Sequence, residues 1–241
     1  MPEPISDLYF RQLLAGRQVA QGHPVAGQMR NFMYLLGDPA TRKAWVVDPA
    51  WDVRSLLAVA ERDGYSLAGA LITHYHPDHV GGDLFGLTIE GLATLLAAHD
   101  VPVYANKHEA HGIHVVTGVS ESDIRKVDDG DRLTIGEHEL RFLHTPGHTP
   151  GSQCFLIDGK LVAGDTLFVQ GCGRVDLPGG DVDTMYHTLT SKLAKLPADT
   201  VLYPGHDYGS TPTSTIGVEL EQNTYLRVPS LADWHRLMGA G

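Results

Sequence analysis

The sequence predicts an α/β protein in which helices and mixed β-sheets form layers. Apolar segments of strand length alternate with segments whose apolar residues recur at helical spacing, a pattern typical of α/β folds. Hairpin signals lie between these segments, and hairpins exclude a purely parallel sheet. The 241 residues suffice for one domain with a sizeable core, since 42% of them are hydrophobic.

The first half of the chain contains five predicted strands and two predicted helices. The strands end at turn signals such as Gly37-Asp38-Pro39 and Asp48-Pro49. Asp52 is a candidate helix N-cap, because apolar residues follow it at helical spacing. The predicted strands are residues 8–14, 32–36, 44–47, 68–73 and 101–104, and the predicted helices are residues 53–60 and 88–98.

The second half begins with two predicted hairpins. Gly136-Glu137 divides residues 133–143 into one hairpin, and Asp158-Gly159, a favoured two-residue turn, joins residues 154–157 to 160–163 in the other. The remaining predictions are a helix over residues 183–196, a strand over residues 200–203, and one or two short helices from residue 215 onward.

The composition excludes several classes of partner. A formal net charge of −11 disfavours nucleic acid and anionic lipid surfaces as partners. No apolar run approaches the roughly 18 residues that cross a bilayer, so we predict no membrane association. Residues 1–4 lack a basic segment followed by an apolar one, which predicts no secretory signal and a cytoplasmic location. A homodimer is compatible with this composition.

The residue types also restrict the metal sites that the chain can form. Two cysteines exclude both a disulfide framework and a zinc site of four thiolates. Fourteen histidines and 29 acidic residues favour a site of imidazole and carboxylate ligands instead.

The strongest local motif is Thr73-His74-Tyr75-His76-Pro77-Asp78-His79, directly after an apolar segment. Pro77 favours an extended conformation at His76, which places His74 and His76 on the same face of the chain. Four metal-binding side chains within six residues predict a metal site rather than a solvated polar loop.

Three further candidate ligands follow short apolar segments, as the first cluster does. His148 lies in a loop between two Pro-Gly turns, Asp165 follows the strand predicted at residues 160–163, and His206 follows the strand predicted at residues 200–203. Strand ends at one edge of a layered sheet can converge on one site. Seven nitrogen and oxygen ligands exceed the needs of one tetrahedral zinc and suit two ions bridged by a carboxylate.

This set of residues resembles the metallo-β-lactamase superfamily of metal hydrolases. The resemblance covers about residues 28–209 and implies a four-layer αββα sandwich with two mixed sheets and the metal site at one edge. It implies one domain over residues 1–241, in which about residues 210–241 form a short C-terminal helical extension.

The resemblance also implies a role for each candidate ligand. The first metal ion would be held by His74, His76 and His148, the second by Asp78, His79 and His206, and Asp165 would bridge the two ions. Asp78 and Asp165 are therefore the predicted catalytic carboxylates. The implied cofactors are two divalent ions, zinc in preference to iron or manganese, with a hydroxide between them as the nucleophile.

Other segments resemble particular branches of the superfamily. Residues 164–168, 171–173 and 205–208 resemble glyoxalase II, a glutathione thioesterase. Arg174 and Asp176 replace the lysine and tyrosine of that branch, and only 35 residues follow His206, too few for its glutathione-binding C-terminal region.

The persulfide dioxygenases are a second branch that the chain resembles, through residues 171–176, 185–187 and 203–208. These enzymes use a single Fe(II), which would be held here by one histidine of the 74/76 pair together with His148 and Asp165. Hydrolysis of a glutathione-type thioester is the predicted activity, and persulfide oxidation is the alternative. A metal-binding protein without turnover is a third hypothesis.

Three residues are predicted to contact a small glutathione-derived or other thioester substrate: Tyr208, Arg174 and Tyr186. Arg174 and Asp176 have a second interpretation as an internal ion pair. The glycines around Cys172 indicate a packed loop rather than a catalytic thiol. A further cluster of His108, His111 and His114 is interpreted as a surface or lid segment and is left out of the site.

Overall fold

The computed structural model describes residues 7–239, and its N-terminal half forms a six-stranded mixed sheet. The strand order is β1-β2-β3-β4-β7-β8; the first three strands are antiparallel, and β3, β4, β7 and β8 are parallel. The strands are β1 (Tyr9–Leu14), β2 (Phe32–Asp38), β3 (Lys43–Val47), β4 (Ser66–Leu71), β7 (Val103–Asn106) and β8 (Ile124–Val127).

The C-terminal half forms a second six-stranded sheet, with the order β16-β15-β12-β11-β10-β9. Only β12 and β15 are parallel, so this sheet is also mixed. Both predicted hairpins lie in it. The strands are β9 (Arg132–Ile135), β10 (His138–His144), β11 (Gln153–Ile157), β12 (Lys160–Gly164), β15 (Val201–Pro204) and β16 (Ser214–Thr215).

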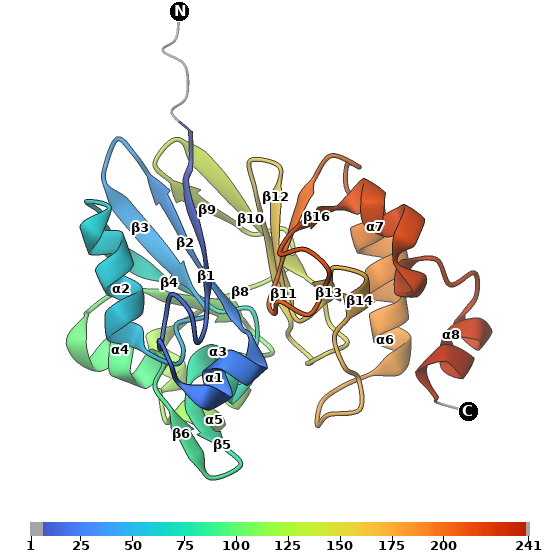
Figure 1. The fold of residues 1–241 in the computed structure, drawn as a ribbon, viewed down its shortest axis with the longest axis horizontal. Coiled ribbons are helices and arrows are strands. Elements are labelled where there is room, and N and C mark those ends of the chain that lie inside the picture. The colour runs from blue at the N-terminus through green and yellow to red at the C-terminus, as the bar shows by residue number, and fades with distance from the viewer. Residues whose placement is uncertain (1–6, 240–241) are drawn as a thin grey trace, which may run out of the picture.

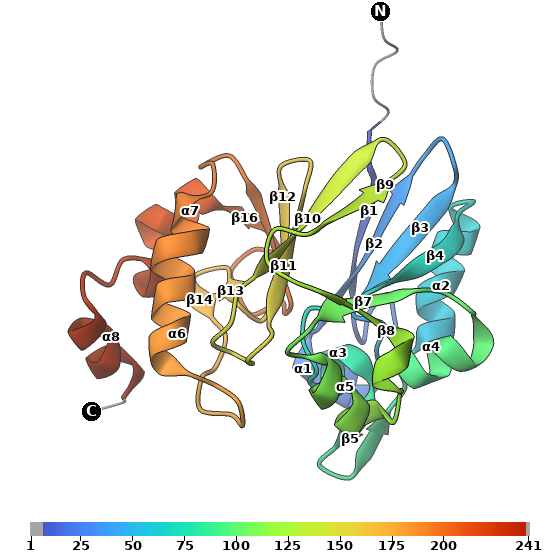
Figure 2. The same ribbon diagram turned by 180° about the vertical axis from the view of Figure 1, so that it is seen from behind.

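Helices cover the outer face of each sheet, as Figures 1 and 2 show from opposite sides. The first sheet is covered by α2 (Val53–Arg62), α4 (Leu92–Ala98) and α5 (Ala110–Thr117). The second sheet is covered by α6 (Val182–His187), α7 (Ile216–Gln222) and α8 (Leu231–Met238). The layers are therefore helix, sheet, sheet and helix, which confirms the predicted αββα sandwich.

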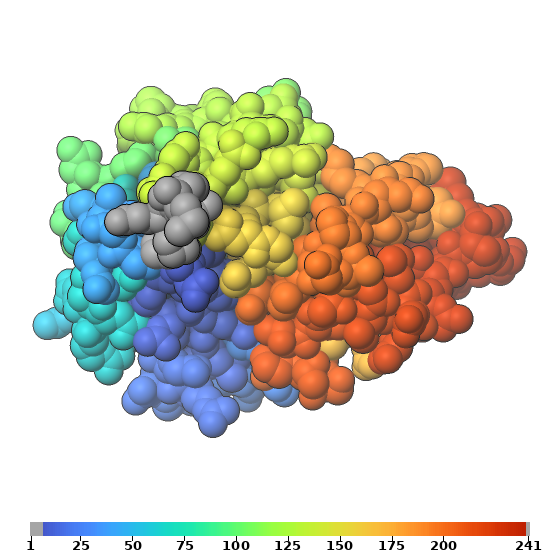
Figure 3. Space-filling model, turned by 90° about the horizontal axis from the view of Figure 1, so that it is seen from above, coloured from blue at the N-terminus to red at the C-terminus, as the bar shows by residue number. Residues whose placement is uncertain are grey.

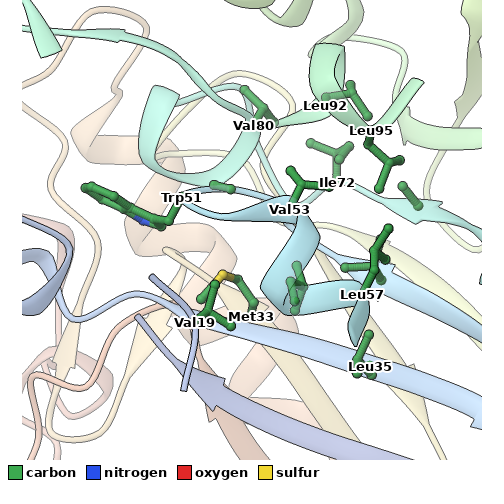
Figure 4. Close-up of a cluster of buried hydrophobic side chains, with 14 of the residues drawn as sticks. Val19, Met33, Leu35, Trp51, Val53, Leu57, Ile72, Val80, Leu92 and Leu95 are labelled. Carbon is green, nitrogen blue, oxygen red and sulfur yellow. The ribbon is translucent and has the colours of Figure 1, made fainter. Parts of the chain in front are cut away.

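Three hydrophobic clusters fill the three spaces between the layers. An aliphatic cluster joins the first sheet to its helices and includes Leu35, Leu57 and Leu95 (Figure 4). Aromatic residues such as Phe142 and Phe155 pack between the two sheets, and a third cluster around Trp234 lies under α6 to α8. Burial of this apolar surface is the main force that holds the layers together.

Some predicted elements differ from the structure. The helix predicted over residues 88–98 begins only at Leu92, because residues 87–89 pair as β6 (Leu87–Ile89) with β5 (Gly82–Leu84) and Gly91 is the N-cap of the helix. The segment predicted as one helix over residues 183–196 consists of α6 (Val182–His187), a π-helical turn (Thr188–Lys192) and a 3-10 turn (Leu193–Lys195). The strand predicted at 101–104 is shifted to Val103–Asn106.

Several short elements were not predicted at all. They are α1 (Pro24–Met29), β8, α5, and the two-residue strands β13 (Leu167–Phe168) and β14 (Gly171–Cys172). Residues 1–4, on which the prediction about a secretory signal rests, lie outside the described residues. Among residues 7–239, no helix combines the length and apolar character needed to cross a bilayer.

The two sheets place their parallel strand ends at a common edge. The strands β4, β12 and β15 end shortly before His74, Asp165 and His206, respectively. In Figure 1, α3 (Pro77–Val80), which follows β4, lies towards the lower edge of the sandwich. Figure 3 shows the opposite edge, where the N-terminal half in blue to green and the C-terminal half in orange to red lie on either side. Loops from both halves therefore meet at the lower edge.

Candidate metal centre

Seven buried or largely buried polar side chains lie together at the lower edge of the sandwich. They form three groups, and within each group the candidate ligand atoms are all within 4.8 Å of one another. The groups are His74, His76 and His148; His74, His79 and Asp165; and Asp78, His79 and His206. The structure thus brings together every residue that the sequence analysis proposed as a metal ligand.

The local sequence explains how the first cluster is presented. His76 has an extended backbone (φ −65°, ψ 145°) and is the N-cap of α3, and Pro77 is the first residue of that helix. The His74 and His76 rings lie 4.8 Å apart, centroid to centroid, which agrees with the predicted common face. One short helical turn after Pro77 then directs Asp78 and His79 into the same space.

We refer to His74, His76 and His148 as the first triad. The Nδ1 of His148 donates a hydrogen bond to the carbonyl oxygen of Arg174 (2.7 Å), so its Nε2 carries a lone pair. This Nε2 lies 3.0 Å from Nδ1 of His76. The Nε2 of His74 is buried and has no hydrogen-bond partner.

We refer to Asp78, His79 and His206 as the second triad. The Nδ1 of His79 donates to Asp48 (2.9 Å), and the Nδ1 of His206 donates to the carbonyl oxygen of Met29 (2.7 Å). The two Nε2 atoms face each other at 3.2 Å. Both lie 3.4–3.5 Å from Oδ2 of Asp78.

Asp165 lies between the two triads. Its carboxylate oxygens are 3.6 Å from Nε2 of His148, 3.4 Å from Nε2 of His79 and 3.3 Å from Nε2 of His206. Its Oδ1 is buried without a hydrogen-bond partner. A Cβ atom on Gly205 would lie 2.2 Å from Oδ1 of Asp165, so only glycine fits beside this carboxylate.

The pKa values of the histidines shift in opposite directions in the two triads. In the first triad, burial lowers the pKa of all three histidines, and that of His76 falls to about 4. In the second triad, burial alone would lower the pKa of His79, but Asp165, Asp78 and Asp48 outweigh it and raise the value to about 9. The pKa of His206 is also raised, through Asp165 and Asp78.

Several buried atoms of this cluster are suited to a cation. Two imidazole Nε2 atoms that face each other at 3.2 Å, with both Nδ1 atoms committed to acceptors, repel unless a proton or metal ion lies between them. The unpartnered Nε2 of His74 and Oδ1 of Asp165 are further buried atoms with lone pairs. Imidazole and carboxylate donors of this kind suit zinc, iron and manganese.

Asp48 supports the second triad, and the sequence analysis did not identify it as a site residue. It follows β3, and besides His79 it accepts hydrogen bonds from the backbone N–H (2.8 Å) and the hydroxyl (2.6 Å) of Thr73. Its position directly after a buried strand, which it shares with Asp165, is the signal that could have revealed it.

Glu109 supports the loops of the first triad and was also not identified. Its carboxylate is fully buried and accepts hydrogen bonds from Tyr75 N–H (2.7 Å), Gly151 N–H (2.6 Å) and the Thr149 hydroxyl (2.8 Å). It thus ties the loop of His74 and His76 to the loop of His148. Burial raises the pKa of Glu109 to about 7.

The structure places the three predicted substrate contacts differently. Tyr208 is 55% exposed and stacks on His206, with 4.6 Å between ring centroids. Arg174 forms an exposed two-point ion pair with Asp176 (2.8 and 2.9 Å), as its alternative interpretation proposed. Tyr186 packs against Trp234, 5.9 Å between centroids, in the outer helical layer.

Cys172 and the histidine cluster of residues 108–114 lie outside the candidate metal centre. Burial raises the pKa of Cys172 to about 12, so its thiol is a poor nucleophile near neutral pH. His111 is exposed beside Glu121, and His114 contacts the carbonyl oxygen of Val119. Neither these two histidines nor His108 belongs to any of the three metal-binding groups.

Comparison with known proteins agrees with this geometry. A family model described as the metallo-beta-lactamase superfamily matches residues 27–206. A hydroxyacylglutathione hydrolase of a Polaromonas strain is 40% identical over 183 residues, which cover 74% of this chain and 63% of that relative. The chain thus spans less than two thirds of that relative.

Persulfide dioxygenases are similar over a larger part of the chain. The human mitochondrial persulfide dioxygenase ETHE1 is 32% identical over 218 residues, covering 86% of this chain and 76% of that relative. The crystal structure of ETHE1 from Myxococcus xanthus superimposes with a TM-score of 0.77 at 28% identity, covering 96% of this chain and 90% of that one.

Proposed function

The chain belongs to the metallo-beta-lactamase superfamily, and from this membership and the geometry of its two triads we propose that it is a dinuclear metal-dependent hydrolase that cleaves glutathione-type thioesters. The observation that carries the proposal is the contact between Nε2 of His79 and Nε2 of His206 at 3.2 Å. His206 and Asp78 group with His79 as candidate ligands and not with His76 or His148, which favours a second ion.

The residues have distinct roles in the proposed site. When bound, a pair of divalent ions acidifies water from a pKa of 15.7 to roughly 7 and polarises a carbonyl group. His74, His76 and His148 would hold one ion, and Asp78, His79 and His206 the other. Asp165, within 3.6 Å of donor atoms from both triads, would hold both at once.

Because the leaving group of this reaction is a thiolate, the protein does not need to supply a strong proton donor. A thiolate departs without strong protonation, so hydrolysis of a thioester does not require a general acid. Tyr208, exposed and stacked on His206, would bind the thiol part of the substrate next to the second triad. The similarity to hydroxyacylglutathione hydrolases supports glutathione as that thiol.

Persulfide oxidation is the alternative, and a specific observation favours it. The human persulfide dioxygenase matches 86% of the chain, more than the hydroxyacylglutathione hydrolase does. One histidine of the 74/76 pair, His148 and Asp165 would then hold a single Fe(II), a two-histidine, one-carboxylate set that suits oxygen chemistry.

Two parallel measurements test the proposal. Elemental analysis of the purified protein should give about two metal ions per chain, and S-lactoylglutathione should be hydrolysed. One iron per chain, with oxygen uptake upon addition of glutathione persulfide, would replace the hydrolase with the dioxygenase. Two bound ions without turnover of either substrate would leave a metal-binding protein.

Asp165→Asn tests the site itself. Loss of the negative charge between the triads should remove bound metal and lower turnover by a factor of about 10³ or more. Asp100→Asn, a substitution of an exposed aspartate, is the matched control and should behave as wild type. Unchanged metal content and turnover in Asp165→Asn would reject the proposed centre.

A further inference from the structure

Asn31 is a buried amide in contact with all three members of the second triad. Its Nδ2 lies 2.9 Å from Oδ2 of Asp78, 3.3 Å from Nε2 of His79 and 3.4 Å from Nε2 of His206. Only 1% of Asn31 is exposed. The only acceptor with a negative charge among the three is Asp78, so the shortest of these contacts is a charge-assisted hydrogen bond.

Trp51 fixes the orientation of this amide. The indole Nε1 lies 3.1 Å from Oδ1 of Asn31, and an indole nitrogen can only donate. The atom of Asn31 that faces Trp51 must therefore be the carbonyl oxygen, which directs the NH2 group towards Asp78. The amide cannot turn over without placing two donors against each other.

The backbone around Trp51 is held in an unfavourable conformation. Its φ is 72°, in the left-handed region that a bulky side chain rarely adopts. Its backbone N–H donates to the carbonyl oxygen of Glu90 (2.9 Å), and its side chain belongs to the hydrophobic cluster between the first sheet and its helices (Figure 4). Backbone strain of this kind persists where the surroundings over-determine it, often at functional sites.

The backbone of Asn31 is also tied to the second triad. Asn31 and His206 form an isolated antiparallel bridge, in which Phe32 N–H donates to Gly205 (2.7 Å) and Asp207 N–H donates to Arg30 (2.9 Å). Met29, two residues earlier, accepts the Nδ1 hydrogen of His206. One short segment therefore orients both His206 and Asp78.

We infer that Asn31, locked by Trp51, is a positioning residue that holds Asp78 in its metal-binding orientation and so determines the affinity of the second metal position. This inference rests on the proposed dinuclear centre. Hydrogen-bond partners of metal ligands typically change metal affinity by about 10–100-fold when they are removed. The first triad has no contact with Asn31 and should keep its affinity.

The test measures zinc binding by four metal-loaded proteins: wild type, Asn31→Ala, Trp51→Phe and Trp234→Phe. Each is dialysed against a series of chelator-buffered zinc solutions, and zinc per chain is counted by elemental analysis. Trp51→Phe keeps the ring and removes only the N–H group. Trp234→Phe is the matched control, because its indole donates to the carbonyl oxygen of Val182 in the distant helical layer.

We expect two binding steps in the wild type and the control. In Asn31→Ala one of the two steps, which we assign to the second triad, should lose about 10–100-fold in affinity, and in Trp51→Phe the same step should lose a smaller factor, while the other step is unchanged. Should Asn31→Ala not fold, Trp51→Phe decides alone. An unchanged or tighter second step in the variants overturns the inference, as does a wild type that binds only one zinc.

Failure of the proposed function has a different signature. A wild type that binds two zinc ions, loses one in the variants and yet does not hydrolyse thioesters would disprove the thioesterase and leave the role of Asn31 intact. A thioesterase whose second zinc binds equally well in all four proteins would disprove the role of Asn31 alone.

Discussion

The two triads contain similar side chains, but the groups that support them differ in charge. The first triad has only imidazoles, and apart from Asp165, which lies between the two triads, the groups that contact them are neutral: the Thr73 hydroxyl beside His74 and the Arg174 carbonyl oxygen beside His148. In the second triad, Asp78 is itself a member, and Asp48 contacts His79. The opposite pKa shifts of the two sets of histidines follow from this difference.

This comparison shows two different surroundings for candidate metal ligands of the same residue type. Burial among other imidazoles keeps the first triad neutral, with its lone pairs free. Carboxylates around the second triad create a site where a positive charge is needed, and a proton or a metal ion can supply it. The ligand alone therefore does not determine how a metal position behaves, since its hydrogen-bond partners set its charge.

The largest expected effect is on the free energy of unfolding, and it concerns Glu109, which joins the two loops that carry the first triad. Glu109 has a folded-state pKa of about 7 against an ordinary value of 4.5, so the folded protein retains a proton that the unfolded chain releases between these values. Its contribution to stability is full below pH 4.5 and is lost as the pH rises to 7, in total about 3 kcal/mol at about 1.4 kcal/mol per pH unit.

Glu109→Gln, which cannot ionise, isolates this contribution. The free energy of unfolding should be measured in urea at pH 5 and pH 7 for both proteins, and the wild type should lose stability relative to the variant between the two. Glu137→Gln, at an exposed glutamate, is the control for the substitution. A difference that does not change with pH would show that Glu109 stays ionised within its three hydrogen bonds.

A smaller effect, on zinc affinity, is expected at Asp48, which accepts a hydrogen bond from His79 of the second triad. In Asp48→Asn, an NH2 group faces Nδ1 of His79, so His79 must carry its proton on Nε2, the atom that faces the other ligands. The second zinc should bind about 10–100-fold more weakly, measured by zinc count in chelator buffers.

Asp38→Asn is the matched control for this change. Asp38 is also buried and also accepts a backbone N–H, that of Thr41, but it is the last residue of β2, next to the turn that leads into β3. Equal losses of zinc in the two variants would mean that the effect is one of general stability and not of His79 orientation.

The smallest expected effect concerns the substrate. Removing the exposed ring in Tyr208→Leu should raise KM for S-lactoylglutathione by up to about 10-fold, equivalent to about 1.4 kcal/mol, with little change in kcat. Tyr186→Leu should leave KM unchanged, because Tyr186 packs against Trp234. A KM effect at Tyr186 and none at Tyr208 would reverse the assignment of the two tyrosines.

The fold and the seven candidate ligands could be predicted because their signals are local. His74, His76, Asp78 and His79 lie within six residues, and His148, Asp165 and His206 each follow a strand whose pattern is visible in the sequence. The start of α4 was missed because the apolar spacing continues unbroken from Ile89 to Leu96, although the helix begins only after its N-cap, Gly91.

The supporting residues could not be predicted because their partners are distant in sequence. Asn31 meets His206 across 175 positions, and Glu109 meets Tyr75 across 34 and Gly151 across 42. No spacing rule connects such pairs, since they depend on how two separate sheets pack. Hydrogen bonds around a ligand are thus the part of a metal centre that the folded structure adds.

Each triad takes two members from the loop that leaves the first sheet and one from the second sheet. An ion bound at either triad would therefore link the loops of the two sheets at one edge of the sandwich. During synthesis, neither position is complete until the ribosome has passed residue 148, and the second must wait for residue 206. The second position would therefore be the later of the two to bind a cation, because a translation product that ends before His206 lacks one of its three ligands.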